Sequence, residues 1–207
     1  MKQFSVGMAL CDFIPVVFFA VAAVLLQRDL YNKMSKGAFA LFAGGTIFII
    51  FAGSSKALYK LLYALDVCDF EALNTLMFPV QSMGFMLAGI GMIAMLFFRQ
   101  KEKVLAVAPP VFKGTMIFVV FMIAGLGMMD FSLCRLSKKL GRKWLIPVFI
   151  LSFVMCLGMG YLSSRDFDKA SMNWIAEGVN VIGQGLFLFG ALKLHKAGLA
   201  ELKLKEE

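Results

Sequence analysis

The sequence predicts an all-helical integral membrane protein. Its residues are 60% hydrophobic and 16% charged, whereas soluble domains average roughly half apolar and about a quarter charged residues. Six apolar segments, each close to the length of about 20 residues that crosses a bilayer, lie at 4–26, 38–57, 74–98, 114–131, 144–162 and 173–193. Short charged connections separate them, so we expect residues 1–207 to form a single membrane domain.

Each apolar segment is expected to be a helix, because backbone amides in lipid must form their hydrogen bonds within their own segment. Strands of a membrane barrel would alternate polar and apolar residues over about ten positions, and these segments do not alternate. The predicted fold class is therefore all-α, a polytopic transmembrane bundle of six helices.

The first segment carries Asp12, about eight residues and roughly 12 Å into the span. A charge at that depth costs at least about 2.5 kcal/mol, so Asp12 should face the bundle interior with a partner or hold a proton. Pro15 follows within a turn and should loosen the helix there. Lys56 and Lys60, near the end of the second segment, are the candidate partners. The alternative for these lysines is a contact with an anion or a lipid headgroup.

The sixth segment has a polar stripe at helical spacing, Asn173, Glu177, Asn180 and Gln184. The third segment carries Asn74 and Gln81, seven residues apart on one helix face. If the two stripes face each other, starting from opposite sides of the membrane, they line a polar path, with Glu177 supplying charge near its mouth. The alternative is that these amides hold neighbouring helices together. The predicted binding or pathway residues are Asp12, Asn74, Gln81, Asn173, Glu177, Asn180 and Gln184, with Lys56 and Lys60 as ion-pair or anion contacts.

An internal repeat is suggested when Asn74 is laid on Asn173, which aligns Gly84 with Gly183. Three spans per half is an odd number, so a direct repeat would leave the halves in opposite orientations. Such inverted three-helix repeats are common in transporters, with sites near the bilayer midplane. The predicted halves are residues 1–103 and 104–193.

The distribution of basic residues predicts the orientation by a narrow margin. With the N-terminus inside and six crossings, 12 of the 21 Lys and Arg residues lie on the cytoplasmic side and nine on the other. The positive-inside rule then favours a plasma (inner) membrane protein with both termini in the cytoplasm. Residues 194–207 are expected to be a basic cytoplasmic tail or a short helix on the membrane surface.

The leading functional hypothesis is a transporter or channel for a small polar solute or ion, moving between the third and sixth segments. The alternative is a membrane sensor or accessory subunit that binds a partner protein or lipid. We expect no enzyme, metal or cofactor, because His195 is the only histidine and the carboxylates are scattered; Asp130, near Arg135, is interpreted as an interfacial residue. Membrane lipids are the expected partners, nucleic acid is not expected, and a homo-oligomer is left open.

Overall fold

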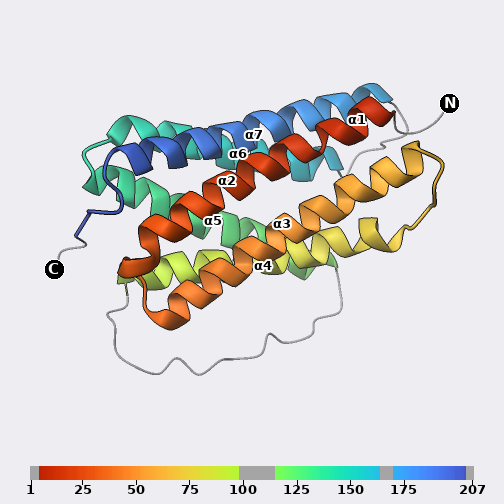
Figure 1. The fold of residues 1–207 in the computed structure, drawn as a ribbon. Coiled ribbons are helices and arrows are strands. Elements are labelled where there is room, and N and C mark those ends of the chain that lie inside the picture. The colour runs from red at the N-terminus through yellow and green to blue at the C-terminus, as the bar shows by residue number, and fades with distance from the viewer. Residues whose placement is uncertain (1–4, 98–114, 164–169, 204–207) are drawn as a thin grey trace.

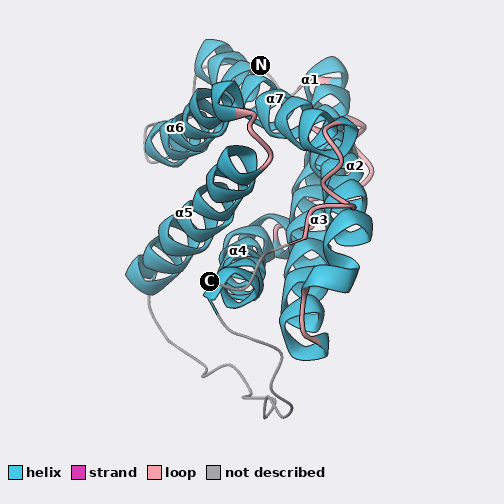
Figure 2. Cartoon of the chain, turned by 90° about the vertical axis from the view of Figure 1, so that its left-hand side faces the viewer, coloured by secondary structure: helices cyan, strands magenta, loops and turns pink. Residues whose placement is uncertain are grey.

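The structure, a computed structural model, describes residues 5–97, 115–163 and 170–203. All regular secondary structure in these ranges is helical (Figure 2). The α-helices are α1 (Val6–Cys11), α2 (Phe13–Leu30), α3 (Lys36–Ala64), α4 (Ala72–Phe97), α5 (Thr115–Lys139), α6 (Ile146–Ser163) and α7 (Ala170–Lys196). Single turns of 3₁₀ helix at Tyr31–Lys33 and Lys143–Leu145 precede α3 and α6.

Five of the helical segments are long and apolar enough to cross a membrane, which confirms the all-helical class and supports an integral membrane protein. Their bounds are Val6–Lys33, Lys36–Ala64, Ala72–Phe97, Ile117–Lys139 and Ser171–Lys196. The predicted span at 144–162 corresponds to a shorter apolar helix, Lys143–Met159.

The first span is interrupted where the sequence carries Asp12 and Pro15. Helix α1 ends at Cys11 and α2 begins at Phe13, with Asp12 between them. Pro15 has no backbone N–H, so it cannot bond the carbonyl of Cys11 one turn earlier. The interruption places the Asp12 side chain in the protein interior, where it is only 6% exposed.

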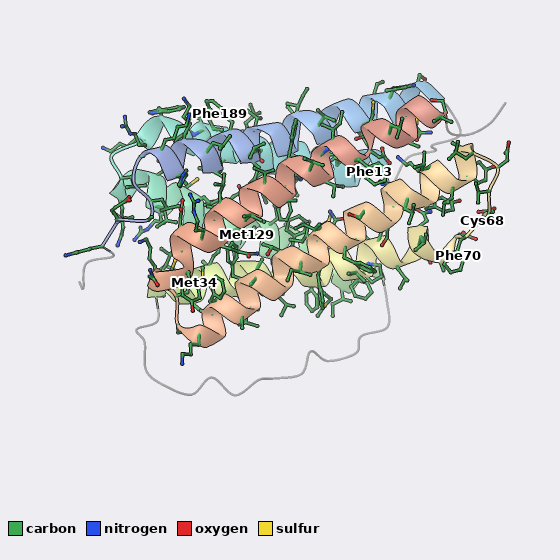
Figure 3. The ribbon with its side chains drawn as sticks, in the orientation of Figure 1. Phe13, Met34, Cys68, Phe70, Met129 and Phe189 are labelled. Atoms are coloured by element: carbon green, nitrogen blue, oxygen red, sulfur yellow. The ribbon has the colours of Figure 1, made fainter. Side chains whose placement is uncertain are left out.

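The long helices form a closed ring. Along it, α2 packs on α3, α3 on α4, α4 on α5, α5 on α6, α6 on α7, and α7 returns to α2 (Figure 2). Side chains such as Met129 pack between the helices, whereas Phe189 lies on the outer edge (Figure 3). Many other large apolar side chains are exposed on the outside of the ring, as expected for surfaces that face lipid.

Corresponding helices of the two halves run in the same direction (Figure 1). Near the start of both α4 and α5, the rings of Phe78 and Phe118 lie 6.5 Å apart, so these two neighbours are parallel. Helices α2 and α7 are parallel as well, with Phe19 stacked on Phe187 at 5.6 Å. The inverted arrangement is therefore not confirmed. The end of α4 and the start of α5 lie at opposite ends of the ring, and the connecting residues 98–114 lie outside the described residues.

The aligned glycines of the two halves nevertheless occupy similar places. A Cβ atom on Gly84 of α4 would lie 2.8 Å from Ile49 of α3, and one on Gly183 of α7 would lie 3.1 Å from Met155 of α6. In each half, the third helix therefore approaches the second through the same glycine position.

The two ends of the ring differ sharply in charge. The basic end, where α2, α5 and α7 finish, carries eleven described Lys and Arg residues, namely Arg28, Lys33, Lys36, Arg135, Lys138, Lys139, Arg142, Lys143, Lys193, Lys196 and Lys203. The acidic end has two, Lys56 and Lys60, against Asp12, Asp66, Asp69, Glu71 and Glu177. The chain termini lie at opposite ends (Figure 1), so the expectation that both termini share one side is not confirmed.

Candidate functional site

A partly open cavity of about 130 Å³ lies inside the ring, and every one of the six long helices contributes to its wall. Its polar lining side chains are Asp12, Lys56, Gln81, Cys156, Glu177, Asn180 and Gln184. Most of the remaining lining consists of Met, Leu and Phe side chains. The cavity lies in the half of the ring nearer the acidic end, since these positions fall in the first half or the middle of α4 and α7 and the second half of α3.

Helix α7 supplies the polar stripe that the spacing of its residues predicts. Glu177, Asn180 and Gln184 all line the cavity, and the Gln184 side-chain amide contacts the Cys156 sulfur at 3.7 Å. Helix α4 contributes Gln81 to the same cavity. Because α4 and α7 are not neighbours in the ring, the two stripes face each other across open space rather than sealing against each other. They start at the same end of the ring, since α4 and α7 are parallel.

Charged groups of both signs meet at the acidic side of the cavity. Asp12 forms an ion pair with Lys60 through Oδ2, while its Oδ1 has no hydrogen-bond partner among the described residues. Glu177 lies within electrostatic range of Asp12, and its Oε1 lacks a hydrogen-bond partner in that part of the chain. Lys56, one helical turn before Lys60, lies in electrostatic range of both carboxyl groups.

Aromatic side chains fill the ring beyond the cavity. Phe85 lines the cavity, and the ring of Phe19 packs against it edge-on, with centroids 6.2 Å apart. Phe187 stacks on Phe19 and meets Phe149 at 6.4 Å. All four rings are almost fully buried. This aromatic layer separates the cavity from the basic end.

Three of the predicted site residues lie away from the cavity wall. Asn74 is exposed at the start of α4. Asn173 is buried near the start of α7, where it makes an interaction of its own. Lys60 takes part through its ion pair with Asp12. The helical spacing places these residues on the correct faces, but Asn74 and Asn173 lie one to two turns nearer the helix starts than the cavity does.

The interpretation of Asp130 as an interfacial residue is wrong. Its side chain is only 4% exposed, and neither carboxyl oxygen has a hydrogen-bond partner among the described residues. The predicted segment ended at residue 131, whereas α5 continues to Lys139. Asp130 therefore lies more than two helical turns inside the helix end. The run Arg135–Lys139, which is basic and rich in helix-forming residues, was the signal that the helix continues.

A second polar cluster lies at the basic end and does not border the cavity. The Asp29 side chain is fully buried and accepts a hydrogen bond of 2.8 Å from His195 Nδ1, while Arg28 donates to His195 Nε2 at 2.9 Å. Lys33 donates to the carbonyl of Ala200 at 2.7 Å. Residues 197–201 form turns, and Leu199 is fully buried. The chain after α7 is thus docked onto the end of α2, neither a free tail nor a surface helix as far as Lys203.

The cavity is large enough for a small polar ligand. One water molecule needs about 10–15 Å³ by the same measure of volume, so several waters or one small solute fit. The described residues contain no group of three or more His, Cys, Asp or Glu side chains placed to hold a metal ion. Comparisons of the chain with known protein families, curated proteins and solved structures find no match.

Proposed function

We propose that this protein transports a small polar solute or ion through the interior of its helix ring. The observation that carries the proposal is the cavity lined by Asp12, Lys56, Gln81, Glu177, Asn180 and Gln184 inside a protein with an apolar exterior. Polar side chains inside a membrane protein are costly unless they face a cavity or one another. Here they surround space that no side chain fills.

The partners of the lining groups support a binding role over a purely structural one. If these amide and charged side chains only held helices together, they would form hydrogen bonds and ion pairs with one another across a closed interface. Asp12 and Glu177 instead each keep an oxygen without a hydrogen-bond partner in the described chain. A ligand with hydrogen-bond donors would satisfy both oxygens, and the Lys56 side chain in the same wall offers a further hydrogen-bonding group.

The charge asymmetry supports an orientation with the basic end in the cytoplasm of a plasma (inner) membrane. Lys and Arg near span ends are enriched on the cytoplasmic side, and eleven of the described ones gather at the basic end. In this orientation the cavity lies toward the outer face, and the aromatic layer of Phe19, Phe85, Phe149 and Phe187 closes it from the cytoplasm. Membrane lipids would cover the exposed apolar faces.

A swelling assay in liposomes tests the proposal. Purified protein is reconstituted, and uptake of glycine, glycerol, methylammonium and potassium ions is followed by light scattering or a trapped dye. We expect the wild type to admit at least one of these above empty liposomes. Gln184→Leu should lower that rate about tenfold or more, because a lost hydrogen bond to a desolvated solute costs about 1–3 kcal/mol.

The matched control is Asn74→Ala, since Asn74 is exposed and lies away from the cavity. Its uptake rate should equal that of the wild type. Equal rates for wild-type protein and empty liposomes with all four probes would contradict the transport proposal. That result would favour the alternative role of a sensor or accessory subunit.

A further inference from the structure

Asp130 is a buried carboxyl group that the cavity does not include. It lies on α5 one helical turn beyond Leu126, which lines the cavity floor. Residues four apart share a helix face, so Asp130 continues the cavity-facing side of α5 about 6 Å deeper into the ring. Cys156, another lining residue, is within electrostatic range of it.

Asp130 differs from the other fully enclosed aspartate in having no partner. Neither Oδ1 nor Oδ2 of Asp130 has a hydrogen-bond partner in the part of the chain that the structure describes. Asp29 is equally buried, but His195 donates to it at 2.8 Å and Arg28 lies beside it. Burial of a carboxylate without such partners is strongly unfavourable, so Asp130 needs a bound positive species.

The elements that pack most closely on α5 provide no ion-pair partner for Asp130 among the described residues. They are α4, α6 and the 3₁₀ turn Lys143–Leu145. Helix α4 contains no ionisable side chain. Of the described side chains nearby, the ionisable ones within range are the thiols of Cys134 and Cys156. Arg135 and Lys143 are exposed and form no ion pair with Asp130.

We propose that Asp130 is a proton-binding site in the interior of the helix ring. A metal cation such as calcium needs about six to eight oxygen ligands, and no group of three acidic, His or Cys side chains surrounds this position in the described residues. A proton requires only the carboxyl group itself. The bound proton makes Asp130 a neutral acid in the buried interior of the ring.

The position of Asp130 beside the cavity links this proton to transport. It lies next to the cavity floor, so rearrangement or hydration of the cavity during solute passage would change whether the proton is retained. The proton is then the coupling ion of the transport cycle. This second step rests on the proposed function, whereas the proton itself is detectable without any transport.

Infrared spectroscopy of the protein in lipid tests the proton site directly. Protein labelled with ¹³C-aspartate shows the carbonyl stretch of each protonated Asp shifted from its unlabelled position. At neutral pH, where an ordinary Asp with a pKa of about 3.9 is ionised, we expect a band from a protonated Asp that is lost in Asp130→Asn. Asp29→Asn is the matched control and should retain the band, because its carboxylate is paired.

If a variant folds poorly, the spectrum of the wild-type protein still tests the proton site. Absence of any protonated-Asp band at neutral pH would overturn the proton site. So would a band that persists in Asp130→Asn and disappears in Asp12→Asn, because the proton would then belong to the cavity pair. Since asparagine resembles the neutral acid in shape, Asp130→Asn should also melt within a few degrees of the wild type.

Coupling of solute uptake to the proton of Asp130 is tested in a separate experiment. With whichever of the four swelling probes passes, an inward pH gradient should accelerate uptake by the wild type and leave Asp130→Asn unaffected. An equal response of both proteins would overturn coupling through Asp130. If no probe passes, the transport proposal fails and the infrared result still decides whether Asp130 binds a proton.

Discussion

The two ends of the helix ring bury carboxyl groups in different ways. At the basic end, Asp29 is enclosed and bonded to His195, and Lys33 ties the chain after α7 to the end of α2. At the acidic end, Asp12 and Glu177 border a cavity and keep unpartnered oxygens among the described residues. The first cluster thus joins two helix ends, while the second keeps the unpartnered oxygens on which the proposed binding site rests.

The assignment of the two ends of the ring depends on α4 and α5 being parallel. Cross-linking of cysteine pairs tests this direction, with an all-or-none result. In a background lacking the four native cysteines, Phe78→Cys with Phe118→Cys should be joined by a short bifunctional thiol reagent, because the two rings lie 6.5 Å apart near the starts of parallel helices. The pair Phe78→Cys with Lys138→Cys should not. The opposite outcome would mean that α4 and α5 are antiparallel and that the two ends were assigned incorrectly.

Asp29→Ala should cause the largest loss of stability. It removes the buried carboxylate that accepts from His195 and lies beside Arg28, and the loss of a buried hydrogen bond to a charged group costs about 1.5–3 kcal/mol. Thermal unfolding in detergent measures the change, and limited proteolysis should show earlier cleavage after α7. Glu71→Ala, at an exposed position of the acidic end, is the control with little expected effect. A stability equal to the wild type would show that Asp29 does not fasten the helix ends.

Gly125→Ala should cost about 1–3 kcal/mol through overpacking. A Cβ atom there would overlap the backbone of Phe85 and Met86, so α4 and α5 could not keep their separation along the cavity wall. Gly44→Ala is the matched control, since a Cβ atom there would meet nothing within 4 Å, and a helical Gly→Ala change there stabilises by roughly 0.5–1 kcal/mol. Equal melting temperatures for the two variants would contradict the close approach.

Glu177→Gln should have the smallest effect on stability, less than about 1 kcal/mol, because glutamine keeps the size of the side chain and its amide can both donate and accept hydrogen bonds. Uptake in the swelling assay should nevertheless fall. This combination would sharpen the contrast with Asp29, whose loss should weaken the fold. A strong loss of stability in Glu177→Gln would instead assign the Asp12–Glu177 pair a structural role like that of Asp29.

The spacing of polar residues along single helices was sufficient to predict much of the cavity wall. Spacings of three and four residues were sufficient to place Glu177, Asn180 and Gln184 on one helix face, and the cost of charge in lipid was sufficient to turn Asp12 inward, where Lys60 pairs with it. These conclusions require only the geometry of a single helix and the cost of placing a charge in lipid.

The direction of the second half could not be derived in the same way. Counting three spans per half assumes that each connection joins two spans on the same side of the membrane. The charged run Arg99–Lys103 within 98–114 has the composition of such a connection, so the sequence contains no sign to the contrary. The depth of Asp130 was missed for a different reason. Hydropathy falls at Asp130 and Ser132, but the helix continues to Lys139 because hydrogen bonding and packing extend it beyond the apolar run.

Labelling of single cysteines on α7 tests most directly whether the ring interior is an accessible polar cavity. Asn180→Cys lines the cavity, whereas Ile182→Cys, two residues away, replaces an exposed side chain on the lipid-facing surface. With the four native cysteines replaced, a small charged thiol reagent added to protein in liposomes should label Asn180→Cys and leave Ile182→Cys almost unlabelled. Equal labelling of the two positions, or faster labelling of Ile182→Cys, would contradict a hydrated cavity and with it the proposed route.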